Sequence, residues 1–212
     1  MPAALSGRKA QAAQNDEVIL EAARAVFVAD PGAPISAVAE KAGVGISALY
    51  RRYPSKEALL RKICGDGLRT YIDVAEACVA DTGEPWEAFA TFMTRVVVAN
   101  THALTLALAG TFEPTQNLYE DAVRGDALND EIVARAKNAG VLRPDLDVGD
   151  LAMIFEQLAA VRLGDDARTE GLRMRYLALT LEALRKSGAN LPGSPPTRAE
   201  LGAKWASDTA GS

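Results

Sequence analysis

The sequence is poor in the residues that carry most redox, metal and catalytic chemistry. Its 212 residues include two cysteines and one histidine, and aromatic residues make up only 6%. No apolar run approaches the roughly 20 residues that a membrane-spanning helix needs. No apolar segment follows Arg8 and Lys9 as it would in a signal peptide. With 49% hydrophobic and 24% charged residues, the composition is that of a globular protein, which we expect in the cytoplasm with no membrane partner.

The two cysteines do not form a disulfide or metal-binding pattern. Cys64 and Cys78 fall within one expected helix, so their separation of 14 residues corresponds to about 21 Å. A disulfide would need their Cα atoms within about 7 Å of each other. We therefore expect two reduced core residues, and the spacing of histidine and cysteine predicts no metal site and no cofactor.

The negative net charge of −5 is unevenly distributed. Residues 1–62 hold nine Lys or Arg against six Asp or Glu, whereas residues 63–212 hold fourteen against twenty-two. An acidic chain can carry a basic functional end. The charge pattern therefore leaves nucleic-acid binding open for the N-terminal part.

The apolar residues recur with the period of an α-helix, and no strand pattern is present. We predict an all-α protein of about nine or ten helices, the first of which follows the cap residues Asn15-Asp16 and ends at Asp30-Pro31-Gly32. Short helices over 35–42 and 46–52 are joined by a turn at Gly43, and Ser55 caps a long helix. This order predicts a helix-turn-helix. The expected parts are a flexible N-terminal arm, a helix-turn-helix domain, a larger helical domain, and a mobile tail rich in Pro, Gly and Ser, over residues 1–14, 15–60, 61–188 and 189–212.

The third helix has the composition of a helix that enters the major groove of DNA. If Leu49 points inward, Ser47, Ala48, Tyr50 and Arg51 point outward. Small residues allow close approach, and arginine can bind guanine through two hydrogen bonds. A three-helix bundle with an ordinary solvated face is the alternative that these residues leave open.

The segment from about Val18 to Leu60 resembles the DNA-binding domain of the TetR (tetracycline repressor-like) family of transcriptional regulators. It covers about a fifth of the chain. The matching positions are dense and ordered: Ala22-Ala23, Phe27, Val38-Ala39, Ala42-Gly43-Val44, Leu49-Tyr50, Tyr53, Ser55-Lys56-Glu57 and Leu59. Two positions depart from the family pattern. Pro34 stands where Ser or Thr is common, which removes one expected phosphate contact, and Gly45 stands where Ser is common, which weakens the cap of the third helix.

The resemblance implies a set of DNA contacts on and around the third helix. The implied base-reading residues are Ser47, Ala48 and Arg51, and the implied phosphate contacts are Tyr50, Lys56 and, from the second helix, Ser36. Arg52 fits either role. A basic arm carrying Arg8 and Lys9 and a tail without contacts remain equal alternatives for the N-terminus.

The resemblance also implies homodimers that pair through the last two helices, here about 148–163 and 166–186. The apolar stripes of these helices predict the interface residues Leu151, Ile154, Leu158, Arg162, Leu172, Tyr176, Leu179 and Ala183. A helix that is apolar on nearly every side must be buried from more than one direction. The second covering surface is expected to come from another copy of the chain.

A pocket for a small-molecule effector is expected in the same helical domain. Its candidate lining combines apolar and aromatic residues with a few polar ones: Trp86, Phe89, Phe92, Met93, Val97, Asn100, His102, Leu106, Phe112, Tyr119, Phe155 and Gln157. Each aromatic residue is equally compatible with plain core packing. His102 is compatible with a surface position, with a buried hydrogen bond or with a ligand contact.

The function favoured by the sequence is a dimeric, ligand-responsive DNA-binding regulator, most simply a repressor acting on a near-palindromic operator. An enzyme is disfavoured because no nucleophile elbow, phosphate loop or metal spacing is present, and no catalytic residue is expected. A helical interaction protein that has lost DNA binding is a third possibility. Tyr50, Arg51 and Lys56 argue against it because all three implied contacts are in place.

Overall fold

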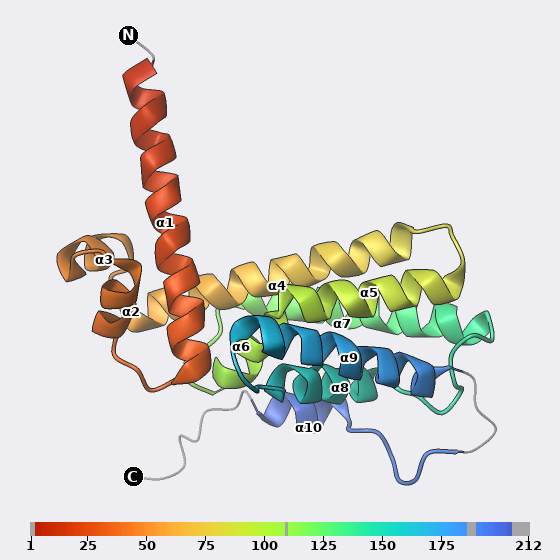
Figure 1. The fold of residues 1–212 in the computed structure, drawn as a ribbon. Helices are drawn as coiled ribbons and strands as arrows, with labels where there is room; N and C mark the ends of the chain where they lie inside the picture. The colour runs from red at the N-terminus through yellow and green to blue at the C-terminus, as the bar shows by residue number, and fades with distance from the viewer. Residues whose placement is uncertain (1–2, 109, 186–189, 205–212) are drawn as a thin grey trace. The chain divides into compact units, whose positions relative to one another are not determined.

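The computed structural model of the chain describes residues 3–108, 110–185 and 190–204, without the side chains of residues 3–14, 103 and 105–107. These residues form ten α-helices and no β-strand, which confirms the predicted all-α class (Figure 1). No helix within the described ranges is long and apolar enough to cross a membrane. The chain divides into two compact units, Met1–Gly65 and Asp66–Ser212.

The first unit contains α1 (Ala3–Ala29), α2 (Ile35–Ala42), α3 (Ile46–Arg52) and the beginning of α4 (Lys56–Ala80). The Ser55 hydroxyl accepts a hydrogen bond from the Ala58 N–H at 3.0 Å, so α4 begins with the predicted cap. Side chains from all four helices meet in a core without solvent exposure: Phe27, Val38, Leu49, Leu59 and Ile63.

The start of α1 differs from the sequence prediction. The helix begins at Ala3 rather than after Asn15-Asp16, because residues 3–14 are rich in alanine, glutamine, lysine and arginine, which favour a helix. The Asp16 carboxylate is consequently not a cap and bonds to α3 instead. The side chains of Arg8 and Lys9, for which a DNA contact was left open, lie outside the described residues.

The second unit contains the rest of α4 and six further helices. These are α5 (Pro85–Ala99), α6 (Thr101–Leu108), α7 (Gln116–Asn138), α8 (Val148–Ala160), α9 (Asp166–Leu184) and α10 (Arg198–Ala203). In Figure 1, α5 returns along α4, and α8 and α9 lie side by side. Asp147 and Asp165 accept hydrogen bonds from the first turns of α8 and α9, as their sequence positions predict.

The core of the second unit is built around aromatic rings. Tyr71 and Phe155 lie edge to face with ring centroids 6.5 Å apart, and Phe92 packs against both. Gly125 does not break α7: it is buried, and a Cβ there would lie 3.7 Å from the Tyr71 ring. That distance is an ordinary van der Waals contact, so α7 has space for a small side chain at this position.

Both cysteines are buried and free, as predicted. Burial raises the pKa of the Cys64 thiol to about 12 and also raises the pKa of Cys78. Neither thiol is ionised at neutral pH, so both behave as small apolar residues.

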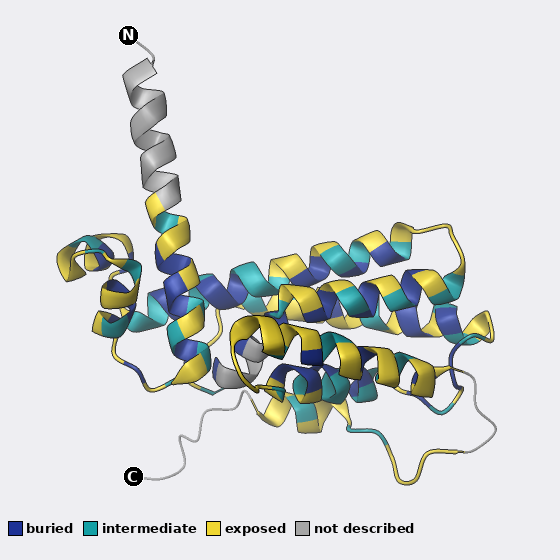
Figure 2. Ribbon diagram, in the orientation of Figure 1, coloured by how far each residue is buried: buried dark blue, intermediate teal, exposed yellow. Residues whose placement is uncertain are grey.

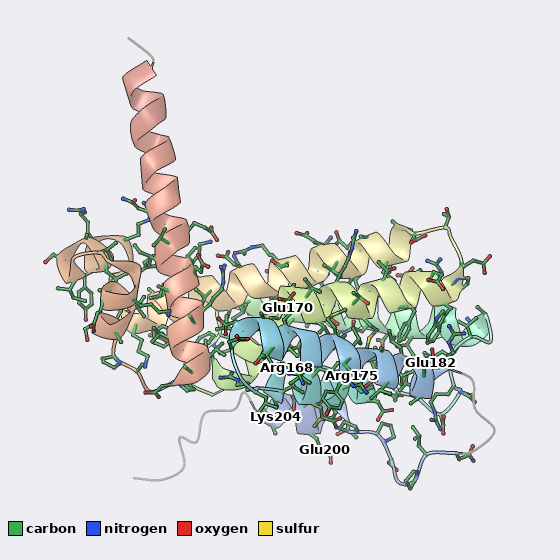
Figure 3. All side chains as sticks on the ribbon, viewed as in Figure 1. Arg168, Glu170, Arg175, Glu182, Glu200 and Lys204 are labelled. Carbon is green, nitrogen blue, oxygen red and sulfur yellow. The ribbon has the colours of Figure 1, made fainter. Side chains whose placement is uncertain are left out.

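Part of the segment predicted to be a mobile tail, residues 189–212, forms contacts in the structure. Residues 190–204, here called the C-terminal strap, bond to the second unit: the Leu191 N–H donates to Asp145 Oδ2 at 2.6 Å. Arg198 pairs with Asp130, and the Nζ of Lys204, a residue labelled in Figure 3, lies 2.7 Å from the Glu156 carboxylate. A capping box between Thr197 and Glu200 starts α10. These contacts are with residues at least 46 positions away in sequence, so composition alone did not indicate them.

Candidate nucleic-acid interface and ligand pocket

The turn between α2 and α3 is fixed by the backbone. Gly43 has φ 66°, in the left-handed region that favours glycine, and its N–H bonds to carbonyls at the end of α2. Pro34 and Gly45 precede α2 and α3 without a side-chain cap. At both positions that depart from the family pattern, Pro34 and Gly45, no side-chain oxygen accepts a hydrogen bond from the first N–H groups of the helix.

The structure places the implied base-reading residues on the outer face of α3. Ser47 and Arg51 are exposed, Tyr50 is 47% exposed and Ala48 is half-buried, while Leu49 is fully buried beneath them. This is the arrangement that the helical period predicts. Ile46, at the beginning of α3, is 40% exposed and adds an apolar residue to this surface.

Arg52 is committed to a contact inside the first unit. Its Nε donates to Asp16 Oδ1 at 2.6 Å, and the Tyr53 hydroxyl donates to the same oxygen at 2.7 Å. The bond from Arg52 is the main reason that the pKa of Asp16 is lowered, against the opposing effect of burial. This Asp16 clamp joins α1 to the end of α3 and thereby fixes the orientation of α3.

Lys56 has a comparable internal role. Its Nζ donates to the Pro31 carbonyl at 2.9 Å and the Ala33 carbonyl at 2.8 Å, and it lies 5.1 Å from the centre of the Phe27 ring. The ammonium group thus fastens the loop between α1 and α2. Two of its three protons are used in this way, so the role implied for it as a phosphate contact depends on the third. Ser36 is exposed near the beginning of α2.

Replacing Asp16 with alanine is expected to lower the stability of the first unit by about 1–3 kcal/mol, because the Arg52 guanidinium and the Tyr53 hydroxyl both lose their partner. Hydrogen exchange of the α1 and α3 amides would measure the change. The matched control is Glu17→Ala, since Glu17 is exposed and lies 3.6 Å from Arg24 in a surface pair. Equal effects of the two substitutions would show that the Asp16 clamp does not hold α3.

A small pocket in the second unit collects four of the twelve residues predicted for an effector site. Val97, Asn100, His102 and Phe155 line it. The sequence missed the other four lining residues: Val96, Leu158, Ala159 and Arg173. Arg173 comes from α9, whose apolar pattern was assigned to dimerisation, so no local signal linked it to α5 and α6.

The remaining candidates for the effector site lie elsewhere. Tyr119 is 62% exposed on α7 and Gln157 is exposed on α8, so neither side chain lines this pocket. Trp86 packs against Phe89 and under the Arg185 guanidinium. Phe92, Met93 and Phe112 are core residues, and the Leu106 side chain lies outside the described residues.

The predicted dimer residues divide into two groups. Leu151, Leu158 and Leu172 are buried within their own unit, because they face the neighbouring helices, and so they are corrected from interface to core. Ile154 is half-buried. An exposed group remains: Arg162, Tyr176, Leu179 and Ala183. Much of α9 is exposed on the face shown in Figure 2, and Leu179 is 58% and Leu163 64% exposed.

Two family models match the chain. Residues 19–63 match the model described as bacterial regulatory proteins of the tetR family, and residues 84–186 match the model of the C-terminal domain of SbtR-like transcriptional regulators. Together these segments make up well over half of the chain. No curated protein matches it.

Solved structures of TetR-type regulators resemble the chain over most of its length. A TetR transcription regulatory protein from Mycobacterium vanbaalenii is 28% identical with a TM-score of 0.55, over 84% of this chain and 98% of that one. PfmR, a TetR family transcriptional regulator from Thermus thermophilus, is 21% identical with a TM-score of 0.60, over 81% and 97%. LfrR from Mycobacterium smegmatis, solved in complex with proflavine, is 21% identical with a TM-score of 0.54, over 79% and 96%.

Proposed function

Since the chain belongs to the TetR family and is a DNA-binding transcriptional regulator rather than an enzyme, we propose that it is a cytoplasmic repressor. It acts as a homodimer on a near-palindromic operator and is released by a small, mostly apolar ligand bound in the helical domain. Residues 15–60 serve as the DNA-binding domain and residues 61–188 as the ligand-binding and dimerisation domain.

The observation that carries this proposal is the outer face of α3. Ser47, Ala48 and Arg51 supply two polar side chains and one small one over a buried Leu49. Such a short helix can approach base edges, and the Arg51 guanidinium fits guanine. Tyr50 and Ser36 contact phosphates, which position the protein without reading sequence.

Arg52 and Lys56 contact the DNA backbone with those N–H groups that are not bonded within the protein. Their bonds to Asp16 and to the loop carbonyls hold α3 and the α1–α2 loop in place. The remaining N–H groups are left for the DNA backbone. Their replacement should therefore lower DNA affinity and the stability of the first unit together, unlike replacement of Arg51.

Homodimerisation is supported by the exposed apolar residues of α9 and its preceding loop. Leu163, Tyr176 and Leu179 would lose contact with water in a dimer. Two DNA-binding domains related by a two-fold axis then reach successive major grooves, about 34–36 Å apart on the operator. Ligand regulation follows if the ligand binds more tightly to the conformation with the wrong spacing.

The test is fluorescence anisotropy with DNA fragments that flank the gene of this protein, titrated with salt. Arg51→Ala is expected to weaken binding to the preferred fragment by about 5- to 150-fold, since a bidentate contact to guanine contributes about 1–3 kcal/mol. The control is Arg24→Ala, which removes the same charge from α1 and should change affinity less than twofold. Arg24 is 39% exposed and outside α3.

Weak binding that is equal for all fragments and unchanged in Arg51→Ala would contradict sequence-specific recognition. It would favour the interaction protein considered from the sequence. A linear fall of the logarithm of the binding constant with the logarithm of salt concentration would, by contrast, show that phosphate contacts contribute to binding.

A further inference from the structure

An aliphatic and an aromatic side chain are exposed on the same side of α3. Ile46 is 40% exposed and Tyr50 is 47% exposed, whereas Leu49 is fully buried beneath the helix. Ile46 and Tyr50 are four residues apart, so they lie about 40° from each other around the helix axis. The surface of α3 that carries the exposed Ser47 and Arg51 therefore continues into a side that is largely apolar.

Ile46 is the first residue of α3, and the turn before it leaves open space. A Cβ built on Gly43 or on Gly45 would meet no atom within 4 Å among the described residues beyond its own chain neighbours. The two glycines thus add no side chain that would keep a partner away from this end of α3. A bulky partner can reach the Ile46 side chain.

The place of Ile46 in the helix-turn-helix identifies this partner as DNA. The N-terminal residues of the second helix of such a motif contact base edges in the major groove. The bases present hydrogen-bond donors and acceptors there, and the C5 methyl group of thymine is the apolar exception. Isoleucine has no polar atom, so it would cover a donor or an acceptor without bonding to it, at a cost in free energy. Its apolar surface matches the thymine methyl group.

We propose that Ile46 reads a thymine in each half of the operator by packing against its C5 methyl group. The contact removes two apolar surfaces from water. Cytosine lacks the methyl group, and guanine and adenine present polar edges, so any other base at this position loses the contact. This inference rests on the proposed DNA binding through α3 and names a base that the same surface selects.

The test replaces single thymines in the preferred DNA fragment with uracil, which pairs in the same way and lacks only the methyl group. Fluorescence anisotropy with the full chain measures the affinity for each fragment. Replacing the contacted thymine in one half-site should weaken binding about fourfold, and replacing it in both half-sites about 15-fold, because the effects of two separate methyl contacts add in free energy. Unchanged affinity at every thymine would overturn the proposal.

The variant Ile46→Ala shows whether this side chain makes the contact. It should bind the thymine fragment more weakly, and its affinities for the thymine and uracil fragments should differ by less than about twofold, because alanine is too short to reach the methyl group. The matched control is Val18→Ala, since Val18 is 42% exposed on α1 and should leave the uracil effect unchanged. Thermal unfolding provides the folding check. A full uracil effect in Ile46→Ala would overturn the assignment.

The same measurements separate this inference from the proposed function. Selective binding that is insensitive to uracil would contradict thymine recognition and leave the proposed repressor in place. Weak binding that is equal for all fragments would contradict both. Weaker binding by Arg51→Ala with the uracil effect retained would support the inference, because it would show that Arg51 and Ile46 read different bases.

Discussion

Acidification from pH 7 to pH 4 is expected to destabilise the second unit by about 3 kcal/mol through His102 alone. The pKa of His102 is lowered from 6.5 to about 4 by burial. Between these values the unfolded chain binds a proton at this position and the folded chain does not. The contribution of neutral His102 to the free energy of unfolding is therefore fully present above about pH 6.5 and is lost as the pH falls toward 4.

Urea unfolding of the wild type and of His102→Phe, at equal protein concentration, would measure this contribution. The variant should lose less stability over the same pH range, and the difference between the two proteins isolates the histidine. Asp16 and Asp145 also have lowered pKa values, through Arg52 and Arg143 respectively. Because their losses occur in both proteins, parallel pH profiles would contradict a neutral, buried His102.

Replacing Gly149 with alanine is expected to detach the C-terminal strap. A Cβ at this position would collide with the Pro196 carbonyl oxygen, which is a backbone atom and moves only with the strap. The loss of the strap contacts should lower the free energy of unfolding by up to about 3 kcal/mol, at the upper end for overpacking. Limited proteolysis should show new cleavage between residues 190 and 204.

Gly171→Ala is the matched control. Gly171 is also helical, but a Cβ there meets no atom within 4 Å. Alanine should therefore stabilise α9 by up to about 1 kcal/mol through its higher helix propensity. If Gly149→Ala is equally stabilising and cleavage is unchanged, the strap does not pack against α8 as described.

The sequence predicted the elements of the first unit well, because their signals are local. Leu49 fixes the inward side of α3, and from that single choice the outward positions of Ser47, Tyr50 and Arg51 follow by geometry. Gly43 marks the turn because only a positive φ joins the two helices so tightly. The caps Asp147 and Asp165 were equally readable, since a capping side chain bonds within three residues of itself.

The errors share a different physical origin, which is contact between distant segments. Asp16 looked like a cap, yet its partners Arg52 and Tyr53 lie 36 and 37 residues further on. No local sequence pattern around Arg173 indicates that it lines a pocket with Asn100 and His102. The contacts of the strap could not be predicted from its Pro, Gly and Ser content, which is that of a free tail, although Thr197 and Glu200 have the spacing of a capping box.

The contact between Gly149 and Pro196 also has an evolutionary consequence. The strap begins beyond residue 186, where the match to the family's C-terminal domain ends, while Gly149 lies inside the matched segment. A homologous chain that lacks the C-terminal extension is free to carry any side chain here, and alanine would favour its helix. Across descendants of a common ancestor, glycine at this position should therefore be inherited together with the extension and be replaced wherever the extension has been lost.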